Sequence, residues 1–508
     1  MKAGGGCRLS VLVLSMLLAL GCAGRRQTVT LLHFNDFHGQ VEALSGKTGE
    51  PTGGLARLAG VVDEVRAGEG REGRPVFLLF AGDAFTGTAF STLFQGEPEF
   101  DAFRLMGVAA MTPGNHEWDF GAGVLAKRAR QAGFPLLLAN VEAPEADQAF
   151  WTSCTTLQAG KRRIGIIGVT TPDTPLTTAP GATAGFVFSD PSRAVARVLA
   201  DHRGHWDFVV VLSHCGFAED RRIARTVPGV GLIVGGHDHK VLQAPWIENG
   251  VPIVQAGDRG RYLGEVRVRF TAGGRPEVSG RLLPVTAESK QDPAVARLLA
   301  PWLEKERRAL GAVIGRLPLA LSGDRELLRV REMPLGDLLA DLMREASGAD
   351  LAFVNAGAIR AGLPKGGVTG LDLYACLPFF DSLNTVRLKG AQIQAILDRC
   401  AAMPLSDAPG GFLQVSGLAA TFEGGKAMSV RVDGEPLAPE RDYSVACTQF
   451  LLKGGDGHVE FTQGADPRDW GISLQELMRR ALAGSGLVIP SGTGRIDRPA
   501  AQAIRPAA

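Results

Sequence analysis

The segment Met111–Gly121 carries side chains suited to acid–base and metal chemistry. Glycine and proline bound it, and loops of that composition hold polar side chains at the surface against a rigid scaffold. Asn115 can offer a neutral oxygen to a metal ion, and His116 can donate a proton or a positive charge. Asp119 follows at a spacing that lets its carboxylate fold back and orient the imidazole. Taken alone, the segment is equally typical of an Asx turn or helix cap beside a surface histidine.

Four further polar segments each follow a short apolar run: His33–Gly39, Ala81–Gly87, Ser213–Gly216 and Gly235–His239. The chain has only nine histidines, and five of them come after these apolar runs or stand in the first segment: His38, His116, His214, His237 and His239. Two imidazoles two residues apart in a glycine-flanked loop, as in GGHDH, suit a metal ion. Each segment alone is typical of an ordinary loop, but the set indicates one shared site.

The combined set predicts a site for two divalent cations. Two cations roughly 3.5–4 Å apart need a bridging carboxylate and mixed nitrogen and oxygen ligands. We expect Asp83 to bridge, because one carboxylate can offer an oxygen to each ion. The other expected ligands are Asp36, His38 and His239 for one ion, and Asn115, His214 and His237 for the second. Imidazole with carboxylate suits Zn, Mn or Fe better than Ca or Mg, and the residues do not choose among the three.

Apolar runs rich in β-branched residues predict the strands that position these loops. The runs are Val29–Phe34, Val76–Phe80, Phe134–Ala139, Arg163–Val169, Phe208–Leu212, Leu232–Val234 and Ile253–Gln255. Helical stretches such as Leu55–Arg66, Val124–Ala132 and Ser192–His202 lie between several of them. Continuously apolar strands alternating with helices are typical of an α/β domain, in which ligands gather at the carboxyl ends of the strands. We predict such a domain over residues 28–285.

The second half of the chain has a different character. Residues 286–314 contain a helical stretch, Asp292–Ala312, which begins with an Asp-Pro capping signal and is expected to be a linker and hinge. Residues 315–497 mix helical stretches such as Met333–Ala346 with short β runs such as Leu351–Val354, and predict an α+β domain. Residues 498–508 are expected to be a disordered tail.

Composition restricts the class of partner. With 508 residues the chain is too long for one compact core, and 45% apolar and 21% charged residues are typical of a soluble globular protein. A formal net charge of +1 argues against a nucleic-acid polymer as partner.

The cysteines indicate no metal site. No CxxC pair occurs, so no zinc knuckle is predicted, and one disulfide among Cys376, Cys400 and Cys447 is left open. Nothing predicts an oligomeric state.

Residues 1–22 predict export. Lys2 and Arg8 precede the apolar run Val11–Leu20, which is too short to span a bilayer but suits a signal peptide. The run ends before Gly21-Cys22 in a pattern that resembles a bacterial lipobox, in which the cysteine is lipidated. We expect a protein of the periplasm or cell envelope, with a lipid anchor at Cys22 as its only membrane contact. Ordinary secretion with cleavage nearby is the alternative.

The ordered motifs NDFHG, GDAFTG, GNHEWDFG, SHCG and GGHDH resemble the calcineurin-like metallophosphoesterase superfamily, and within it the bacterial periplasmic and animal ecto-5′-nucleotidase family. The resemblance implies an N-terminal metallophosphoesterase α/β sandwich and a C-terminal α+β nucleotidase domain. It also implies that a metal-activated hydroxide attacks phosphorus. The pair His116 and Asp119 would then stabilise the transition state as catalytic residues.

The motifs DRELLR, NAGAIR, LPFF, GGFLQVSG and QFLLKGGDG resemble the nucleotidase C-terminal domain in matching order. Arginine can grip phosphate in a bidentate way, although exposed arginines are mostly solvated. The resemblance implies that Arg325, Arg329 and Arg360 hold the negative groups of the substrate, Asn355 contacts the base, Phe379 and Phe450 sandwich it, and Asp456 binds the ribose. Ala356 and Ala358 stand where the family has glycine, which puts the substrate in doubt more than the chemistry.

The implied reaction is hydrolysis of nucleoside 5′-monophosphates to nucleoside and phosphate, with nucleotide sugars or di- and triphosphates as further substrates. The same machinery could act on 2′,3′-cyclic nucleotides, UDP-sugars or a thiosulfate-type substrate. From another class, the chain could be a surface-binding lipoprotein with a catalytically dead site. Metal content and phosphate release from AMP separate these hypotheses.

Overall fold

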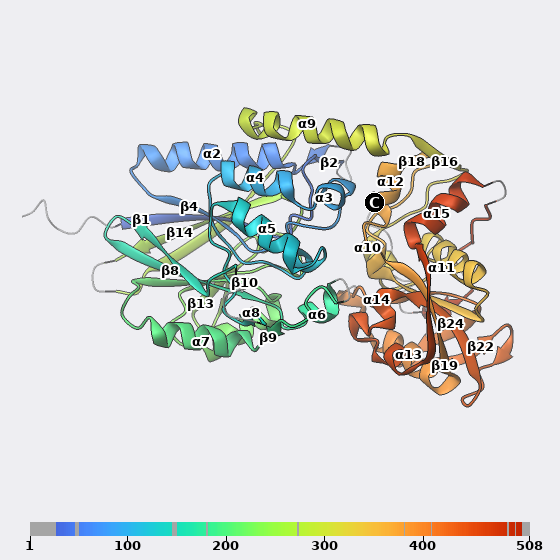
Figure 1. Ribbon diagram of the computed structural model, residues 1–508. Coiled ribbons are helices and arrows are strands. Elements are labelled where there is room, and N and C mark those ends of the chain that lie inside the picture. Colours follow the sequence, from blue (N-terminus) through green and yellow to red (C-terminus); the bar gives the residue numbers. More distant parts are fainter. Residues whose placement is uncertain are drawn as a thin grey trace, which may run out of the picture.

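The structure is a computed structural model, and it describes residues 27–45, 50–144, 150–178, 181–271, 274–379, 381–407, 409–484, 487–492 and 494–499. Two domains lie side by side, and helix α9 (Pro293–Leu310) extends over the N-terminal domain toward the C-terminal one (Figure 1). The expected signal peptide, including Cys22, lies outside the described residues. Among the helices that are described, none has the length and hydropathy required to cross a membrane.

The first sheet of the N-terminal domain has five strands in the order β15-β14-β1-β4-β5. Strands β1, β4 and β5 are parallel, and β14 and β15 are antiparallel additions at one edge. The bounds are β1 Gln27–Phe34, β4 Val76–Phe80, β5 Val108–Met111, β14 Tyr262–Phe270 and β15 Glu277–Pro284. Because β1, β4 and β5 are parallel, the loops that leave their carboxyl ends meet at one edge of the sheet.

The second sheet has six strands in the order β12-β13-β11-β10-β8-β7. Its four central strands are parallel, and β7 and β12 are antiparallel edge strands. The bounds are β7 Cys154–Ala159, β8 Arg162–Thr170, β10 Phe208–His214, β11 Leu232–Val234, β12 Trp246–Glu248 and β13 Val251–Val254. Short strand pairs are formed by β2 Leu44–Ser45 with β3 Pro51–Thr52, and by β6 Val141–Glu142 with β9 Val187–Phe188.

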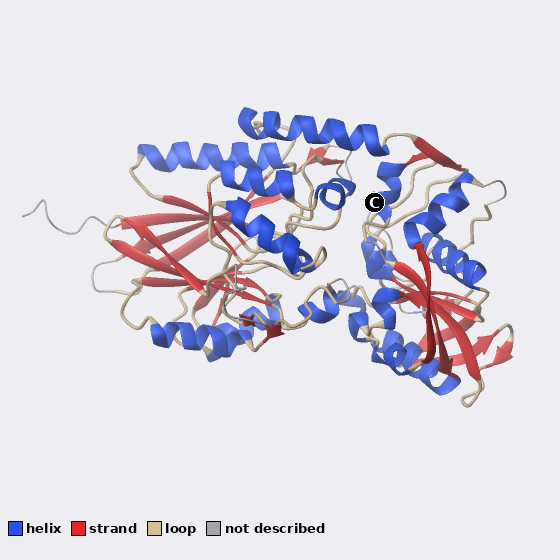
Figure 2. Ribbon diagram, viewed as in Figure 1, coloured by secondary structure: helices blue, strands red, loops and turns tan. Residues whose placement is uncertain are grey.

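The parallel strands of both sheets are largely buried on both faces, which explains their nearly continuous apolar sequences. Along β10, Val210 and Leu212 pack toward the first sheet, whereas Val209 and Val211 pack beneath α7 and α8. Helices α2, α4 and α5 cover the outer face of the first sheet (Figure 2). The helix bounds are α2 Leu55–Arg71, α3 Ala89–Phe94, α4 Glu97–Leu105, α5 Ala122–Ala132, α6 Thr174–Thr177, α7 Pro191–Asp201 and α8 Phe217–Thr226. The result is the predicted α/β sandwich.

One predicted strand is wrong. The run Phe134–Ala139 is not a strand, and only Leu136 and Leu137 form isolated bridges, to Met111 and Thr152 respectively. The segment crosses from β5 at the edge of the first sheet toward the second sheet, so it pairs with neither over any length. Its side chains are apolar because they are buried between layers, and a short apolar run does not distinguish that role from a strand. Strand β5 was not among the predicted strands.

Helix α9 lies within the region predicted to be a linker. Oδ1 of Asp292 accepts hydrogen bonds from the backbone N–H groups of Ala294 and Val295, both at 2.7 Å, and so caps the helix as the Asp-Pro signal predicted. Val295 and Leu299 are buried in the apolar layer that also includes α2 and α4. The helix also contacts α12 of the C-terminal domain, so it touches both domains.

The C-terminal domain is α+β, as predicted. A mixed five-stranded sheet, β20-β17-β24-β19-β25, packs with helices α11, α13 and α15 around one core. A four-stranded sheet, β23-β22-β21-β26, and the pair β16-β18 complete it. The strands are β16 Val313–Leu317, β17 Leu351–Asn355, β18 Gly366–Thr369, β19 Ser382–Lys389, β20 Leu413–Ser416, β21 Leu418–Glu423, β22 Lys426–Val432, β23 Glu435–Pro436, β24 Asp442–Thr448, β25 Ala465–Ser473 and β26 Ile496–Asp497. The helices are α10 Arg325–Leu328, α11 Pro334–Ser347, α12 Gly370–Cys376, α13 Gly390–Ala402, α14 Gln449–Leu452 and α15 Leu474–Ala483.

Two expectations for this domain are resolved. Cys376, Cys400 and Cys447, for which one disulfide was left open, are all free and buried. The predicted boundary of the disordered tail, residue 498, is wrong, because the side chain of Arg498 is buried. Its guanidinium donates hydrogen bonds to the carbonyl oxygens of Ala401 at 3.1 Å and Met403 at 2.6 Å. These bonds attach Arg498 to the C-terminal end of α13.

Candidate active site

The candidate metal ligands lie in loops at the carboxyl ends of strands from both sheets. Asp36 and His38 follow β1, Asp83 follows β4, Asn115 follows β5, His214 ends β10, and His237 and His239 follow β11. Five of these residues adopt positive φ: Asp36 (49°), His38 (51°), Asp83 (60°), His237 (87°) and His239 (60°). Left-handed backbone costs a non-glycine residue roughly 1–2 kcal/mol, and such strain is concentrated at functional sites.

Asp36, His38 and His239 form the first cluster. The Nε2 atoms of His38 and His239 lie 3.0 Å apart, and Oδ1 of Asp36 lies 3.4 Å from Nε2 of His239. Two ring nitrogens and a carboxylate oxygen that converge in this way suit a divalent cation. This is the ligand set expected for one ion.

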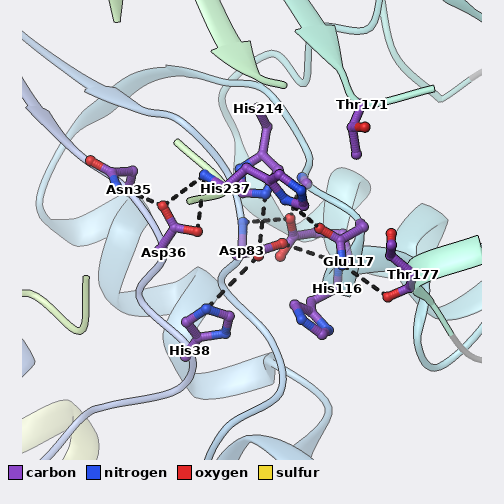
Figure 3. Close-up of polar contacts among 12 residues, drawn as sticks. Asn35, Asp36, His38, Asp83, His116, Glu117, Thr171, Thr177, His214 and His237 are labelled. Atoms are coloured by element: carbon purple, nitrogen blue, oxygen red, sulfur yellow. Dashed lines mark hydrogen bonds and ion pairs between the residues drawn. The ribbon is translucent and has the colours of Figure 1, made fainter. Parts of the chain in front are cut away.

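Asp83, His214 and His237 form the second cluster. Oδ2 of Asp83 lies 3.2 Å from Nε2 of His214 and 3.8 Å from Nε2 of His38, so Asp83 joins the second cluster to the first (Figure 3). Oδ1 of Asn115 lies 3.1 Å from Nδ1 of His237. Nε2 of His214 is buried and has no partner in hydrogen-bond geometry, which fits a nitrogen that would bind a cation.

Burial and neighbouring charges shift the pKa values of residues in both clusters. Burial raises the pKa of Asp36 to about 8. Burial also raises the pKa of Asp83, but the charges of His214 and His116 outweigh it and hold that pKa well below its usual range. Burial lowers the pKa of His214, and the carboxylate of Asp83 outweighs it and raises the pKa to about 10. Ligands of this kind must lose protons when a metal binds, so the donor set fits a cation that takes the place of those protons.

His116 and Asp119 form the predicted pair. Oδ2 of Asp119 lies 2.6 Å from Nδ1 of His116. The carboxylate also accepts hydrogen bonds from the hydroxyl groups of Thr86 at 2.6 Å and Thr178 at 2.7 Å, two residues without a predicted role. Burial lowers the pKa of His116, but Asp119 and Asp83 raise it more, so the net shift is upward. The imidazole is therefore oriented, and its cationic form is favoured.

Glu117 is a buried residue of the site that sequence reasoning missed. Its carboxylate accepts hydrogen bonds from the backbone N–H groups of Asp83 (2.9 Å), Ala84 (2.6 Å), Phe85 (3.2 Å) and Gly114 (2.6 Å). It thereby joins the loop after β4, which carries Asp83, to the loop after β5, which carries Asn115. The only signal was its place inside GNHEWDFG, where an acidic residue is flanked by site residues.

Two further supporting residues, Asn35 and Asp258, were also missed. Asn35 donates to Oδ2 of Asp36 at 2.6 Å and to the carbonyl of Gly257 at 2.6 Å. Oδ2 of Asp258 lies 3.4 Å from Nδ1 of His239. A carboxylate behind a histidine fixes the ring orientation and the tautomer of a metal ligand. Asp258 comes shortly after the run Ile253–Gln255, which was the available signal.

A cavity of about 460 Å³ opens beside the two clusters, between the domains. Its lining contains both predicted catalytic residues, several metal candidates and all predicted substrate-binding residues: His116, Asp119, Asp83, Asn115, His237, His239, Arg325, Arg329, Asn355, Arg360, Phe379, Phe450 and Asp456. Cavities of this size commonly hold small organic ligands. The fold thus brings the two predicted residue sets to one place.

Contacts across the cavity join the domains. Nη1 of Arg325 lies 2.9 Å from Nδ1 of His239, and the ring centroids of Phe379 and His116 are 6.0 Å apart.

Other contacts lie within the C-terminal wall of the cavity. The guanidinium of Arg360 lies 5.7 Å from the centroid of the Phe379 ring. Asn355 and Asp456, expected to contact base and ribose separately, are hydrogen-bonded to each other at 3.0 Å.

Comparisons with known proteins agree with the two-domain fold. The family model for calcineurin-like phosphoesterases matches residues 29–241, and the model for the 5′-nucleotidase C-terminal domain matches residues 313–463. The crystal structure of a 5′-nucleotidase precursor from Thermus thermophilus is 32% identical with a TM-score of 0.83, over 93% of this chain and 99% of that chain. The 5′-nucleotidase of Vibrio vulnificus is 29% identical, over 85% of this chain and 86% of the relative. That of Bos taurus is 28% identical, over 95% and 93%.

Proposed function

Because the chain belongs to the 5′-nucleotidase family and is a metal-dependent phosphoesterase hydrolase, we propose that it cleaves nucleoside 5′-monophosphates to nucleoside and phosphate at a dinuclear metal centre. One observation carries this proposal. Asp83 joins two clusters of candidate ligands, and the cavity it lines is also lined by Phe379 and Phe450. A site for a phosphoryl group and a site for a nucleobase therefore share one cavity.

The donor set supports two cations. Asp36, His38 and His239 would hold one, Asn115, His214 and His237 the other, with Asp83 bridging. Ions of the Zn, Mn or Fe type bound there would supply Lewis acidity at the phosphoryl group and an activated water molecule.

His116 assists the chemistry from the cavity wall. Asp119 accepts from Nδ1 of the ring, which leaves Nε2 to hold a proton or positive charge near the phosphoryl oxygens and the leaving 5′-oxygen. Charge develops at those oxygens in the transition state, and a preoriented cation there stabilises it more than it stabilises the substrate. Arg325, Arg329 and Arg360 would orient the substrate through its negative groups.

The two phenylalanines would recognise the nucleoside. Stacking on an aromatic ring is worth roughly 1–3 kcal/mol per base and tolerates different bases. We therefore propose loose base selectivity, with Asn355 contacting the base and Asp456 the ribose.

We propose further that the protein is exported and lipid-anchored at Cys22. The basic n-region, the short apolar run and the cysteine that follows support this. Expression in a bacterium with labelled palmitate tests it. Label should appear in the wild type and disappear in Cys22→Ala, and equal label in both contradicts the anchor.

Phosphate release from AMP, UDP-glucose, a 2′,3′-cyclic nucleotide and glycerol 2-phosphate tests the activity. AMP should have the highest kcat/KM, and Phe379→Ala or Phe450→Ala should lower it by about 10–100-fold. Glycerol 2-phosphate has no aromatic ring and is the matched control, so the same variants should barely affect its hydrolysis. Equal losses on both substrates contradict base recognition. No release from any substrate favours the surface-binding alternative.

A further inference from the structure

Asp381 lines the cavity but has no part in the mechanism proposed above. It follows Phe379 by two residues and directly precedes β19, and its side chain is partly buried. The two rings of the proposed clamp, Phe379 and Phe450, come from separate segments of the C-terminal domain, and Phe450 belongs to α14 (Figure 1). A base can stack on both rings only if the two segments are held at a fixed separation. The contacts that join these segments therefore decide whether the clamp forms.

The carboxylate of Asp381 is bonded to the start of α14. Its Oδ1 accepts a hydrogen bond from the backbone N–H of Phe450 at 3.1 Å. Burial raises the pKa of the carboxyl to about 6. Hydrogen bonds lower it in part, and their donors are the backbone N–H of Phe450, the hydroxyl of Thr448, and the backbone N–H groups of Gln449 and Ser382. A carboxylate has about four acceptor positions, so these donors leave it little capacity for a ligand, and it acts on the protein.

The segment that carries Phe379 is fixed independently. Nε2 of Gln475, on α15, donates hydrogen bonds to the carbonyl oxygens of Leu377 at 2.7 Å and Phe379 at 2.6 Å. The backbone carbonyl oxygen of Asp381 accepts from the N–H of Leu474, also on α15, at 3.1 Å. Helix α15 therefore holds this segment by its backbone, and the side chain of Asp381 joins the held segment to α14.

The position of the Phe450 ring follows that of the α14 backbone. On one side the ring lies against Gly455, where an added Cβ would be only 2.4 Å from ring atom Cε1. The ring also lines the cavity. It is therefore confined between the backbone of Gly455 and the cavity, and a shift of α14 relative to the Phe379 segment would change the spacing of the two rings.

We propose that Asp381 is a positioning residue that sets the spacing of the two rings for a nucleobase. The inference rests on the proposed function, because the clamp is the proposed site of the base. Stacked rings have centroids about 4.5–7 Å apart, so a base held on both faces tolerates little displacement of either ring. Loss of the Asp381 carboxylate should therefore weaken binding of the nucleoside and leave the chemistry at the metal centre unchanged.

The test measures KM and kcat for AMP and for glycerol 2-phosphate in the metal-loaded full-length enzyme. Asp381→Asn keeps the shape but turns an NH₂ group toward backbone donors. It should raise KM for AMP by about tenfold and change kcat by less than about threefold, because charge-assisted hydrogen bonds to α14 are lost. Both constants for glycerol 2-phosphate should stay within about twofold, since this substrate has no ring to stack.

Asp398→Asn is the matched control. Oδ1 of Asp398, on α13, also accepts a backbone N–H, that of Ala427 at 2.8 Å, but Asp398 does not line the cavity. This variant may lose as much stability as Asp381→Asn, yet its KM for AMP should equal that of the wild type. Melting temperatures of both variants separate a loss of stability from a loss of the clamp.

A double-mutant cycle with Phe450→Ala tests whether Asp381 acts through the ring. Once the ring is removed there is no clamp to position, so adding Asp381→Asn should raise KM for AMP by less than about twofold. A further tenfold rise would mean that Asp381 contacts the substrate itself, and it would overturn the inference. If Asp381→Asn fails to fold, Asp381→Glu replaces it in the same cycle, because it keeps the charge but is one methylene too long.

Three other results also overturn the inference: an unchanged KM for AMP in the Asp381 variants, an equal rise for glycerol 2-phosphate, and an equal rise in Asp398→Asn. If Phe450→Ala raises KM for AMP and the Asp381 variants do not, the proposed function stands and only this inference fails. If Phe450→Ala itself leaves KM for AMP unchanged, the proposed clamp is contradicted, and the inference fails with it.

Discussion

Oδ2 of Asp119 lies 2.6 Å from Nδ1 of His116, and hydroxyl groups of two threonines donate to the same carboxylate. Three donors on one carboxylate fix its orientation, so the plane of the imidazole depends on the two threonine hydroxyl groups as well as on Asp119. One donor, Thr178, stands 59 residues away in the sequence. The pair is therefore a local sequence motif whose geometry depends on a distant loop.

His116→Ala should lower kcat for AMP by about 10²–10⁴-fold, as expected for a positioned general acid or charge-stabilising group. Bound metal should stay at the wild-type level, because His116 is outside the expected ligand set. Steady-state kinetics and elemental analysis of the same sample check this. A loss of one metal ion in the variant would instead identify His116 as a ligand. Thr178→Val, which removes one hydroxyl at constant shape, should lower kcat several-fold and leave KM unchanged.

Glu117→Gln should both destabilise the protein and weaken metal binding. Glu117 accepts four backbone N–H groups, whereas an amide has one oxygen and would turn its NH₂ toward some of those donors. The expected loss is about 2–4 kcal/mol of unfolding free energy. Denaturant unfolding and metal titration measure the two effects. Glu64→Gln, at an exposed position of α2, is the matched control and should change neither. Unaltered metal affinity in Glu117→Gln would refute the anchoring role.

We expect the unfolding free energy to fall as pH rises, because the carboxyl group of Glu99 is buried. Burial raises the pKa of this carboxyl from 4.5 to about 8, and the charge of Glu306 on α9 adds to the shift. Between those pH values the unfolded chain releases the proton and the folded chain keeps it. The folded state then binds more protons, so unfolding free energy decreases with pH across this window.

Glu99→Gln should remove that decrease. At pH 5 the variant and the wild type should differ little, and at pH 8.5 the variant should be more stable by roughly 2–4 kcal/mol. Denaturant unfolding at pH 5, 7 and 8.5 measures the difference, with Glu64→Gln as the control for loss of an exposed charge. Parallel stability profiles for Glu99→Gln and the wild type would show that burial of Glu99 is not coupled to folding.

Removal of metal should abolish activity and lower the melting temperature. Bound cations offset the cost of burying the ligand nitrogens and carboxylates and the repulsion between the carboxylates. Without the cations, that cost lowers the stability of the fold. Binding at a thousandfold excess over Kd stabilises a fold by about 4 kcal/mol. Chelation followed by titration with Zn, Mn or Fe salts should restore activity at two equivalents, and Asp83→Asn should bind fewer. Full activity after exhaustive chelation would contradict the proposed metal centre.

The sequence by itself determined the two-domain architecture and the set of candidate residues that the fold brings together. Each candidate ligand follows an apolar run, and the strands β4 and β11 have the predicted bounds, Val76–Phe80 and Leu232–Val234. Because buried parallel strands align their carboxyl ends, residues at strand ends are brought together whatever lies between them in the chain. Local pattern therefore suffices to assemble such a set.

Only the tertiary structure decided which polar side chains support that set. Glu117 and Asp258 look like ordinary loop residues in the sequence, and their roles come from partners on other loops: the backbone of Asp83 for Glu117, and the imidazole of His239 for Asp258. Phe134–Ala139 was likewise misassigned, because layers distant in sequence bury it. The cost of burying a charge or a polar group depends on what surrounds it in three dimensions, and no local pattern records that environment.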